Sequence, residues 1–320
     1  MAPDRARRFP WPVPYGWFAV AWSAHLSAGG VVPYRAFGRD LVLWRDERGA
    51  AHLQDAYCPH LGAHLGEGGH VDGEDLVCPF HGWCFDGNGR NTCIPYSERT
   101  NAKAQLHTYP VLERNGLVMA WYHPADEPPM WDIPVLDEFS GDHPDWAPAT
   151  CRYFTIDTAW QEMAENGVDS AHFRYVHGTA EVPVLEAYEP DGPRSHMRSK
   201  QFFVTPRGTV EGRIDTDAWG PGFSVVRFSG IVDTVLLGCA TPLDDEHCEM
   251  RFTFTVRRLG DERATASVGE AAINEISRQL LEDKPIWEHK VFVERPALAD
   301  TDGPFLRFRQ WAAQFYADPA

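Results

Sequence analysis

Two short cysteine–histidine motifs constrain this chain more than any other feature. Cys58 and His60 form the first motif, and Cys78 and His81 form the second after a gap of seventeen residues, so the pattern reads C-x-H-x17-C-x2-H. A [2Fe–2S] cluster that has two cysteines on one iron and two histidines on the other needs this set of ligands. We therefore predict that Cys58 and Cys78 bind one iron of such a cluster and that His60 and His81 bind the other.

Zinc is the alternative occupant, because two cysteines and two histidines can also form a zinc site. Structural zinc sites more often space their ligands as C-x2–4-C and H-x3–5-H, which this sequence does not match. Glycines are frequent around the two motifs and would allow tight loops to bring backbone N–H groups near cluster sulfurs. They are Gly62, Gly66, Gly68, Gly69 and Gly82. The sequence therefore favours the iron–sulfur cluster.

A second metal site is indicated by His172 and His177, which lie five residues apart. Residues 158–178 contain no proline and end at Gly178, a pattern that predicts one helix with a glycine cap. Two imidazoles and one carboxylate form the facial triad of non-haem Fe(II) enzymes. Side chains five residues apart diverge by about 140° around an ideal helix. We therefore expect the helix to loosen near Gly178. Two surface histidines are the alternative, and the presence of the cluster motif in the same chain argues against it.

The carboxylate of this iron site is not fixed by local spacing. Asp169 lies one turn before His172 and is either the third ligand or a hydrogen-bond partner of a ligand. Asn166 lies one turn before Asp169, where its amide can form a hydrogen bond near the iron.

The chain divides into two domains according to its pattern of apolar residues. Residues 1–125 contain short apolar runs broken by turn residues, which predicts an all-β domain. Residues 126–149 are rich in proline and acid and read as a connector. Residues 150–320 follow as a catalytic domain, in which 200–257 alternate as in an antiparallel sheet and 269–282 form a long helix. The fold class is therefore α+β.

Composition excludes several functions. The chain has 46 acidic and 29 basic residues, a net charge of −17, which repels nucleic acid. No run approaches the roughly 20 apolar residues of a membrane span. The N-terminal segment lacks the apolar core of a signal peptide, and the seven cysteines are an odd and scattered set. We therefore expect a cytoplasmic protein with reduced thiols.

The motifs resemble those of a known family. CPHLGAHLGEGGHV and CPFHGWCFDGNGR resemble the cluster-binding loops of Rieske oxygenases. CIPY, WYHP, EDKPIWEHK and the closing DGP and RQWAAQFY are similar to the subgroup of 3-ketosteroid 9α-hydroxylase oxygenases and cholesterol 7-desaturases. The resemblance implies an N-terminal all-β Rieske domain and a catalytic domain with an antiparallel sheet flanked by helices. It also implies that Asp283 is the carboxylate ligand, with the adjacent Glu282 as its competitor. Asp169 would then bridge to the cluster of a neighbouring subunit.

These two metal sites together suggest reductive activation of O2 beside a bound substrate. The subgroup resemblance implies that this substrate is apolar and steroid-like or polycyclic. Hydroxylation is the expected reaction; desaturation, demethylation and a non-catalytic Rieske electron carrier are the alternatives. The resemblance implies a homotrimer, in which the cluster of one subunit serves the iron of the next. No G-x-G-x-x-G fingerprint is present, so electrons should come from a ferredoxin and/or a ferredoxin reductase. The apolar segment 225–237 is a candidate wall of the substrate pocket, and core packing is the alternative for the same residues.

Overall fold

The computed structural model describes residues 8–205 and 208–317 and divides them into two compact units. One unit comprises residues 17–130, and the other combines residues 8–16 with 131–317. This division differs from the predicted one at the start of the chain, because residues 8–16 group with the second unit. There the backbone N–H of Tyr15 donates to the carbonyl of Phe315 over 2.8 Å. The predicted connector 126–149 is not a separate body, since its residues from 131 onward also belong to the second unit.

The unit 17–130 is built from three small sheets, as the prediction of an all-β domain requires. Their strand orders are β1–β11–β10, β2–β3–β4–β9 and β5–β6–β7–β8. The strands are β1 (Gly16–Trp22), β2 (Val31–Ala36), β3 (Arg39–Arg45), β4 (Ala51–Asp55), β5 (His70–Asp72), β6 (Asp75–Val77), β7 (Cys84–Phe85), β8 (Asn91–Cys93), β9 (Thr108–Tyr109), β10 (Val111–Arg114) and β11 (Leu117–Tyr122), with a 3-10 turn η1 (Ser23–His25). Every residue of β11 is buried, so this strand supplies much of the apolar core.

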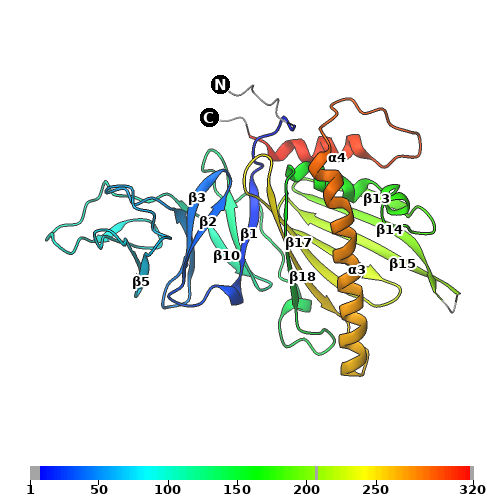
Figure 1. The fold of residues 1–320 in the computed structure, drawn as a ribbon, viewed down its shortest axis with the longest axis horizontal. Helices are drawn as coiled ribbons and strands as arrows, with labels where there is room; N and C mark the ends of the chain where they lie inside the picture. The colour runs from blue at the N-terminus through cyan, green and yellow to red at the C-terminus, as the bar shows by residue number, and fades with distance from the viewer. Residues whose placement is uncertain (1–7, 206–207, 318–320) are drawn as a thin grey trace. The chain divides into compact units, whose positions relative to one another are not determined.

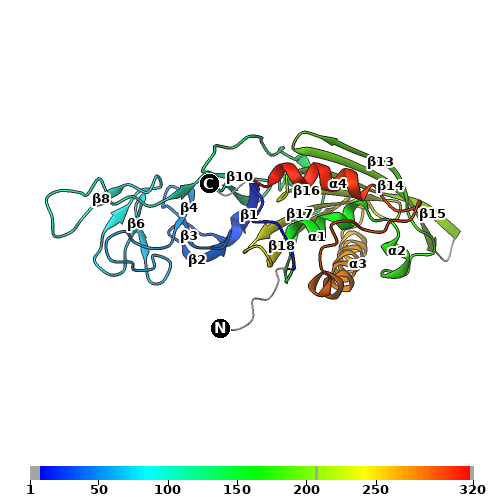
Figure 2. The ribbon, with the colours of Figure 1, turned by 90° about the horizontal axis from the view of Figure 1, so that it is seen from above.

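The other unit contains a seven-stranded antiparallel sheet in the order β12–β18–β17–β16–β15–β14–β13. Its strands are β12 (Thr150–Ile156), β13 (Val184–Asp191), β14 (Arg194–Thr205), β15 (Gly208–Trp219), β16 (Ser224–Ser229), β17 (Thr234–Pro242) and β18 (Cys248–Val256). Its helical segments are η2 (Asp137–Phe139), α1 (Trp160–Ala164), η3 (Glu165–Val168), α2 (His172–Tyr175), α3 (Glu262–His289), α4 (Phe305–Ala312) and η4 (Ala313–Phe315). Helix α3 lies across one face of this sheet (Figures 1 and 2). The predicted antiparallel sheet flanked by helices is confirmed.

The long helix is larger than the sequence predicted. It begins after Asp261, whose carboxylate accepts the backbone N–H of Ala264, and it continues through Pro285 to His289. Gly269 allows close packing on the sheet, because a Cβ atom there would lie 2.7 Å from a methyl group of Val256. The predicted range of 269–282 was therefore too short at both ends.

The predicted single helix over residues 158–178 is wrong. The structure breaks it into α1, η3 and α2, and the chain is extended at Asp169 (φ −97°, ψ 98°). The carboxylate of Asp169 accepts the backbone N–H groups of Ala171 (3.1 Å) and His172 (3.4 Å), so a local cap replaces the helical hydrogen bonds. Gly178 follows with φ +70°, as a terminating glycine should.

Two contacts anchor the segment that carries these breaks. The buried carboxylate of Glu165 pairs with the guanidinium of Arg309 on α4. Gly303 packs against the end of η3. A Cβ atom at position 303 would lie only 1.7 Å from the carbonyl oxygen of Val168. The C-terminal residues therefore hold η3 in place.

Replacing Arg309 with Met is expected to destabilise this unit by about 3–5 kcal/mol, because it leaves the buried Glu165 carboxylate without its partner. The melting temperature should fall by about 10 °C, measured by circular dichroism. Arg307→Met removes an exposed arginine from the same helix and is the matched control. Equal melting temperatures for the two variants would contradict an anchoring role for the pair.

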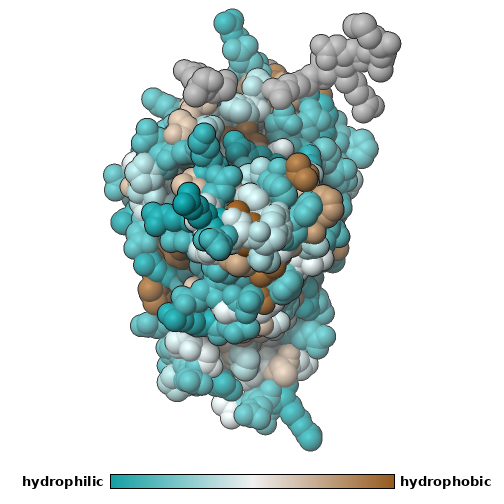
Figure 3. All heavy atoms as spheres, turned by 90° about the vertical axis from the view of Figure 1, so that its left-hand side faces the viewer, coloured by the Kyte–Doolittle hydropathy of each residue, from teal (hydrophilic) through white to brown (hydrophobic). Residues whose placement is uncertain are grey.

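One face of the structure is mostly hydrophilic. Hydrophilic residues cover most of the face drawn in Figure 3. Hydrophobic residues on that face stand among hydrophilic ones. Within the described ranges, no helix is both long and apolar enough to span a bilayer.

Candidate metal centres

The two cysteine–histidine motifs adopt the same turn. In each, the carbonyl of the cysteine accepts the backbone N–H of the glycine four residues later, from Gly62 to Cys58 (2.9 Å) and from Gly82 to Cys78 (3.0 Å). Both glycines have positive φ, +77° and +68°, which other residues rarely adopt. The repeated glycine after each motif therefore has a structural cause.

The turns direct like groups toward each other. Cys58 and Cys78 are buried in one apolar cluster with Leu65 and Leu76, and their thiols are close enough to interact. Burial raises the pKa of Cys58 to about 11, although the backbone N–H groups of His60 and Leu61 donate to its sulfur and oppose the shift. Two adjacent buried thiolates need a compensating positive charge, which a metal cluster provides.

The two histidines of the motifs also lie together. The ring centroids of His60 and His81 are 4.7 Å apart. The ring of His60 stacks on Trp83 at 4.3 Å with an interplanar angle of 8°, and the indole N–H of Trp83 donates to the hydroxyl of Tyr96 over 2.7 Å. The structure thus brings the two cysteines together and the two partly exposed histidines together, a grouping that fits a cluster with one cysteine-bound and one histidine-bound iron.

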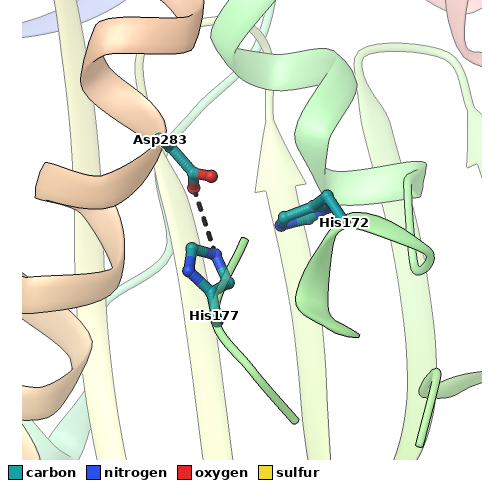
Figure 4. Close-up of side chains that lie close together, drawn as sticks. All are labelled: His172, His177 and Asp283. Carbon is teal, nitrogen blue, oxygen red and sulfur yellow. Dashed lines mark ion pairs between the residues drawn. The ribbon is translucent and has the colours of Figure 1, made fainter. Parts of the chain in front are cut away.

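The second centre brings together three residues that are far apart in the sequence (Figure 4). His172 comes from α2, His177 from the loop after it, and Asp283 from α3. One ligand atom from each lies within 4.8 Å of the others. Nε2 of His177 is 3.4 Å from Oδ2 of Asp283. Two imidazoles and one carboxylate in this arrangement match a facial triad, and they leave one side open.

Each imidazole has a carboxylate behind it. Nδ1 of His177 donates to Oε2 of Glu282 over 3.0 Å, while Nε2 faces Asp283. Nδ1 of His172 is buried without a hydrogen-bond partner among the described residues, and Oδ2 of Asp169 is 3.7 Å away. Metal-bound histidines commonly turn one nitrogen to the metal and the other to a carboxylate. Both rings are therefore oriented as metal ligands are.

The site attracts positive charge. Burial lowers the pKa of His177, but its hydrogen bonds with Asp283 and Glu282 outweigh this effect, and the pKa is raised overall. Burial raises the pKa of Asp169, but the nearby imidazole of His172 and the hydrogen bonds from backbone N–H groups outweigh this effect, and the pKa is lowered overall. The same negative potential would favour a bound cation.

Asn166 links the ligands of the second centre. Its Nδ2 donates to Oδ2 of Asp283 over 3.0 Å and lies 3.3 Å from Nε2 of His172. The amide therefore fixes the carboxylate relative to one imidazole, which agrees with a position near the metal.

The three acids that the sequence offered as the carboxylate ligand lie in different positions relative to the two histidines. Asp283 is 8% exposed and belongs to the group of possible metal ligands, whereas Glu282 and Asp169 lie behind His177 and His172. The role of Glu282 as a partner of His177 was missed, because no sequence spacing connects residues 177 and 282. Gly303 was also missed as an anchor, although it lies in the quoted DGP motif.

A cavity of about 320 Å3 opens beside the second centre. His172, His177 and Asp283 are part of its wall. Its floor is one face of the sheet, where Thr216, Val226 and Leu236 stand next to each other on β15, β16 and β17. Large apolar side chains from the helices cover it, namely Trp160, Met163, Trp287, Phe308 and Trp311. The wall is therefore mostly apolar, with polar groups gathered at the metal-binding end.

Comparison with protein-family models gives two matches that together span most of the chain. Residues 16–110 match the Rieske [2Fe-2S] domain, and residues 120–316 match the 3-ketosteroid 9alpha-hydroxylase C-terminal domain. The chain belongs to this family of Rieske oxygenases. Such Rieske oxygenases carry a [2Fe–2S] cluster and a mononuclear iron, and the residues described above fit both groups.

Similar proteins support the same assignment. A 3-ketosteroid-9-alpha-monooxygenase oxygenase component of Rhodococcus rhodochrous is 30% identical over 317 residues, which cover 95% of this chain and 80% of the relative. A cholesterol 7-desaturase of Bombyx mori is also 30% identical, over 97% of this chain and 71% of that protein. The crystal structure of dicamba monooxygenase bound to dicamba has a TM-score of 0.76 at 21% identity and covers 94% of this chain and 96% of its own, which shows a shared fold. The predicted family, fold class and cofactors of this Rieske oxygenase are confirmed.

Replacing Glu282 with Leu is expected to weaken mononuclear iron binding by about 10–100-fold, because the ring of His177 loses the carboxylate that orients it. Glu282→Gln keeps an oxygen acceptor and should recover part of the loss. The measurement is iron occupancy of the second centre across a titration with Fe(II) under anaerobic conditions. Glu270→Gln, an exposed site on the same helix, serves as the control. If Glu282→Leu binds iron as tightly as this control, Glu282 does not orient His177.

Proposed function

We propose that this chain is the oxygenase component of a system that hydroxylates an apolar, steroid-like or polycyclic substrate. The observation that carries the proposal is the convergence of His172, His177 and Asp283 on the wall of a mostly apolar cavity. The relatives named for 3-ketosteroids and cholesterol support the steroid class. Electrons would come from a ferredoxin and/or a ferredoxin reductase.

In this proposal the chain's own residues position and shield the reaction. Iron held by His172, His177 and Asp283 would supply open positions for O2, and the cluster held by Cys58, His60, Cys78 and His81 would supply single electrons. Asn166 holds the carboxylate of Asp283 by a hydrogen bond. The apolar wall excludes water and holds a flat ring system beside the metal ligands. The polar groups at one end of the cavity define which part of the substrate reacts.

Hydroxylation and desaturation differ in where the oxygen goes. Hydroxylation uses one C–H bond, O2, two electrons and two protons, and it gives an alcohol and one water. Desaturation uses the same O2, electrons and protons but removes two hydrogens and gives an alkene and two waters. Turnover of a panel of steroids and aromatic compounds under 18O2 tests this, because only hydroxylation leaves one labelled oxygen atom in the product. A product without label would overturn the proposed reaction.

A non-catalytic electron carrier is the second candidate, and it would have a cluster but no mononuclear iron. The oxygenase should contain about three iron atoms and about two acid-labile sulfides per chain. A carrier should contain about two of each, and a zinc protein would be colourless. Metal analysis with an EPR spectrum of the dithionite-reduced protein separates these cases.

The proposal includes a homotrimer in which the cluster of one subunit lies next to the iron of its neighbour. A head-to-tail contact of this kind closes into a ring. Sedimentation equilibrium should therefore give about three chains per particle.

Asp169→Asn is expected to keep most of the mononuclear iron and a reducible cluster, yet to lower turnover at least about tenfold. Asn retains the oxygen that caps Ala171 and His172, so the local turn should survive. It lacks the charge that would bridge the two centres. The measurement is single-turnover reoxidation of the prereduced cluster with substrate and O2. If Asp169→Asn loses its iron while Asp283→Ala keeps both iron and turnover, the two roles are reversed.

A further inference from the structure

A second cavity of about 280 Å3 lies between α3 and the sheet. Its wall is mostly apolar, with Ile231 and Val232 on the sheet side and Val268 and Ala272 on α3. Ile231 is 62% exposed, so the cavity lies close to the surface at this end. None of the metal ligands lines it.

Only a layer of side chains separates this cavity from the one beside the metal ligands. Four residues line both cavities. Ile214 and Phe228 are direct partners on the paired strands β15 and β16. Ile276 and Gln279 are one turn apart on α3, on the other side of the layer. Since side chains can change rotamer without a change of backbone, a rotation of these side chains would connect the two cavities.

The second cavity also contains a buried polar group without a partner. Gln201 on β14 is 6% exposed and lines the cavity. Its Nε2 forms no hydrogen bond with any residue in the described part of the chain. A buried donor of this kind is unfavourable unless a ligand or water satisfies it. Gln201 therefore indicates that an acceptor binds here.

We propose that the second cavity is an annex of the active site, which binds the distal end of an elongated apolar substrate. This rests on the proposed function, because the reacting end would lie in the cavity beside the metal ligands. The distal end carries an uncharged hydrogen-bond acceptor, such as a hydroxyl, ketone or ester oxygen, which accepts from Gln201. It is uncharged because Glu275 lines the annex and no described basic residue does. The annex nearly doubles the space available to a ligand.

The first test measures how affinity depends on substrate length. A series of 3-ketosteroids with saturated side chains of increasing length at ring D is titrated into the oxidised holoenzyme by calorimetry. Each methylene that enters the annex should lower Kd about fourfold. Ala272→Phe fills the annex and should abolish this dependence, while affinity for the steroid without a side chain stays the same. Ala266→Phe, on the same helix and outside both cavities, is the control.

The second test concerns the polar group and does not depend on filling the cavity. A side chain that ends in a hydroxyl should bind more tightly than the same chain ending in a methyl group. Gln201→Leu keeps the size of the side chain and removes the donor, so it should reduce this preference by about fivefold. An unchanged preference would overturn the role of Gln201.

A third probe separates failure of the annex from failure of the proposed function. Crystals of the holoenzyme are soaked with 1-bromooctane, and the anomalous signal of bromine locates the alkyl chain. Bromine in the annex with no binding of any steroid would refute the steroid class and keep the annex. Steroid binding that is independent of side-chain length would refute the annex, wherever 1-bromooctane binds. The annex is also refuted if neither probe binds there.

Discussion

His177→Ala should remove the mononuclear iron and lower turnover by more than about 100-fold. This loss is larger than the loss of roughly 10–100-fold that follows from replacing a residue that only orients a ligand. His177 is a proposed ligand whose Nδ1 faces Glu282 and whose Nε2 faces Asp283. Without the imidazole, one protein nitrogen and one carboxylate remain, which bind Fe(II) more weakly than a full triad. The cluster spectrum should persist, because the cluster motifs lie in the other compact unit.

The measurements are iron content, the visible spectrum and oxygen incorporation from 18O2. His196→Ala is the control, since His196 pairs with Asp217 in the same unit and lies outside the metal-binding group. Normal turnover in His177→Ala would refute the facial triad. Loss of iron in both variants would point to general damage of the unit rather than to loss of a ligand.

Cys78→Ser should abolish the cluster and all turnover while leaving about one mononuclear iron per chain. A serine oxygen is a poor ligand for a site that selects thiolates. Cys78 is 3% exposed and packs in the same apolar cluster as Leu65 and Leu76. The variant should therefore also lose stability in the unit 17–130, because cluster binding and folding are coupled there.

Visible absorption, circular dichroism and EPR of the reduced protein report the cluster directly. Cys151→Ser changes a partly buried thiol in the other unit and should leave these spectra unaltered. An unchanged spectrum in Cys78→Ser would show that the cluster is bound elsewhere.

The cluster motifs could be predicted because their geometry is local. Each turn is closed within five residues by hydrogen bonds from its own glycine, so the spacing in the sequence reflects the spacing of the ligands. The carboxylate of the second centre has no such local signal. Asp283 lies on a helix that reaches the histidines only through the packing of α3 on the sheet, and the resemblance alone selected it.

The broken helix shows a limit of the pattern used to predict it. Residues 158–178 lack proline, yet Asp169 interrupts them by accepting backbone N–H groups that a helix would use differently. Asp is a common cap at the start of a short helix, so the sequence D-S-A-H at residues 169–172 could have predicted the break. The break also resolves the expected divergence of His172 and His177, because the two residues no longer belong to one regular helix.

The pocket wall illustrates the effect of strand alternation. The sequence allows segment 225–237 to be either a wall of the substrate pocket or part of the core. Val226, Phe228 and Leu236 do line the cavity, whereas Val225 and Leu237 do not. Successive side chains of a strand point to opposite faces, so only alternate residues can contribute.

The separation of the three ligands along the chain has a further consequence for folding. A metal ion that joins His177 to Asp283 would close a loop of about 100 residues, which contains most of the seven-stranded sheet. Like a disulfide, such a cross-link lowers the conformational entropy of the unfolded chain, and for a loop of this length the chain-entropy estimate is about 4.7 kcal/mol. An ion bound there would thus also act as a structural cross-link, which ties α3 to the loop after α2.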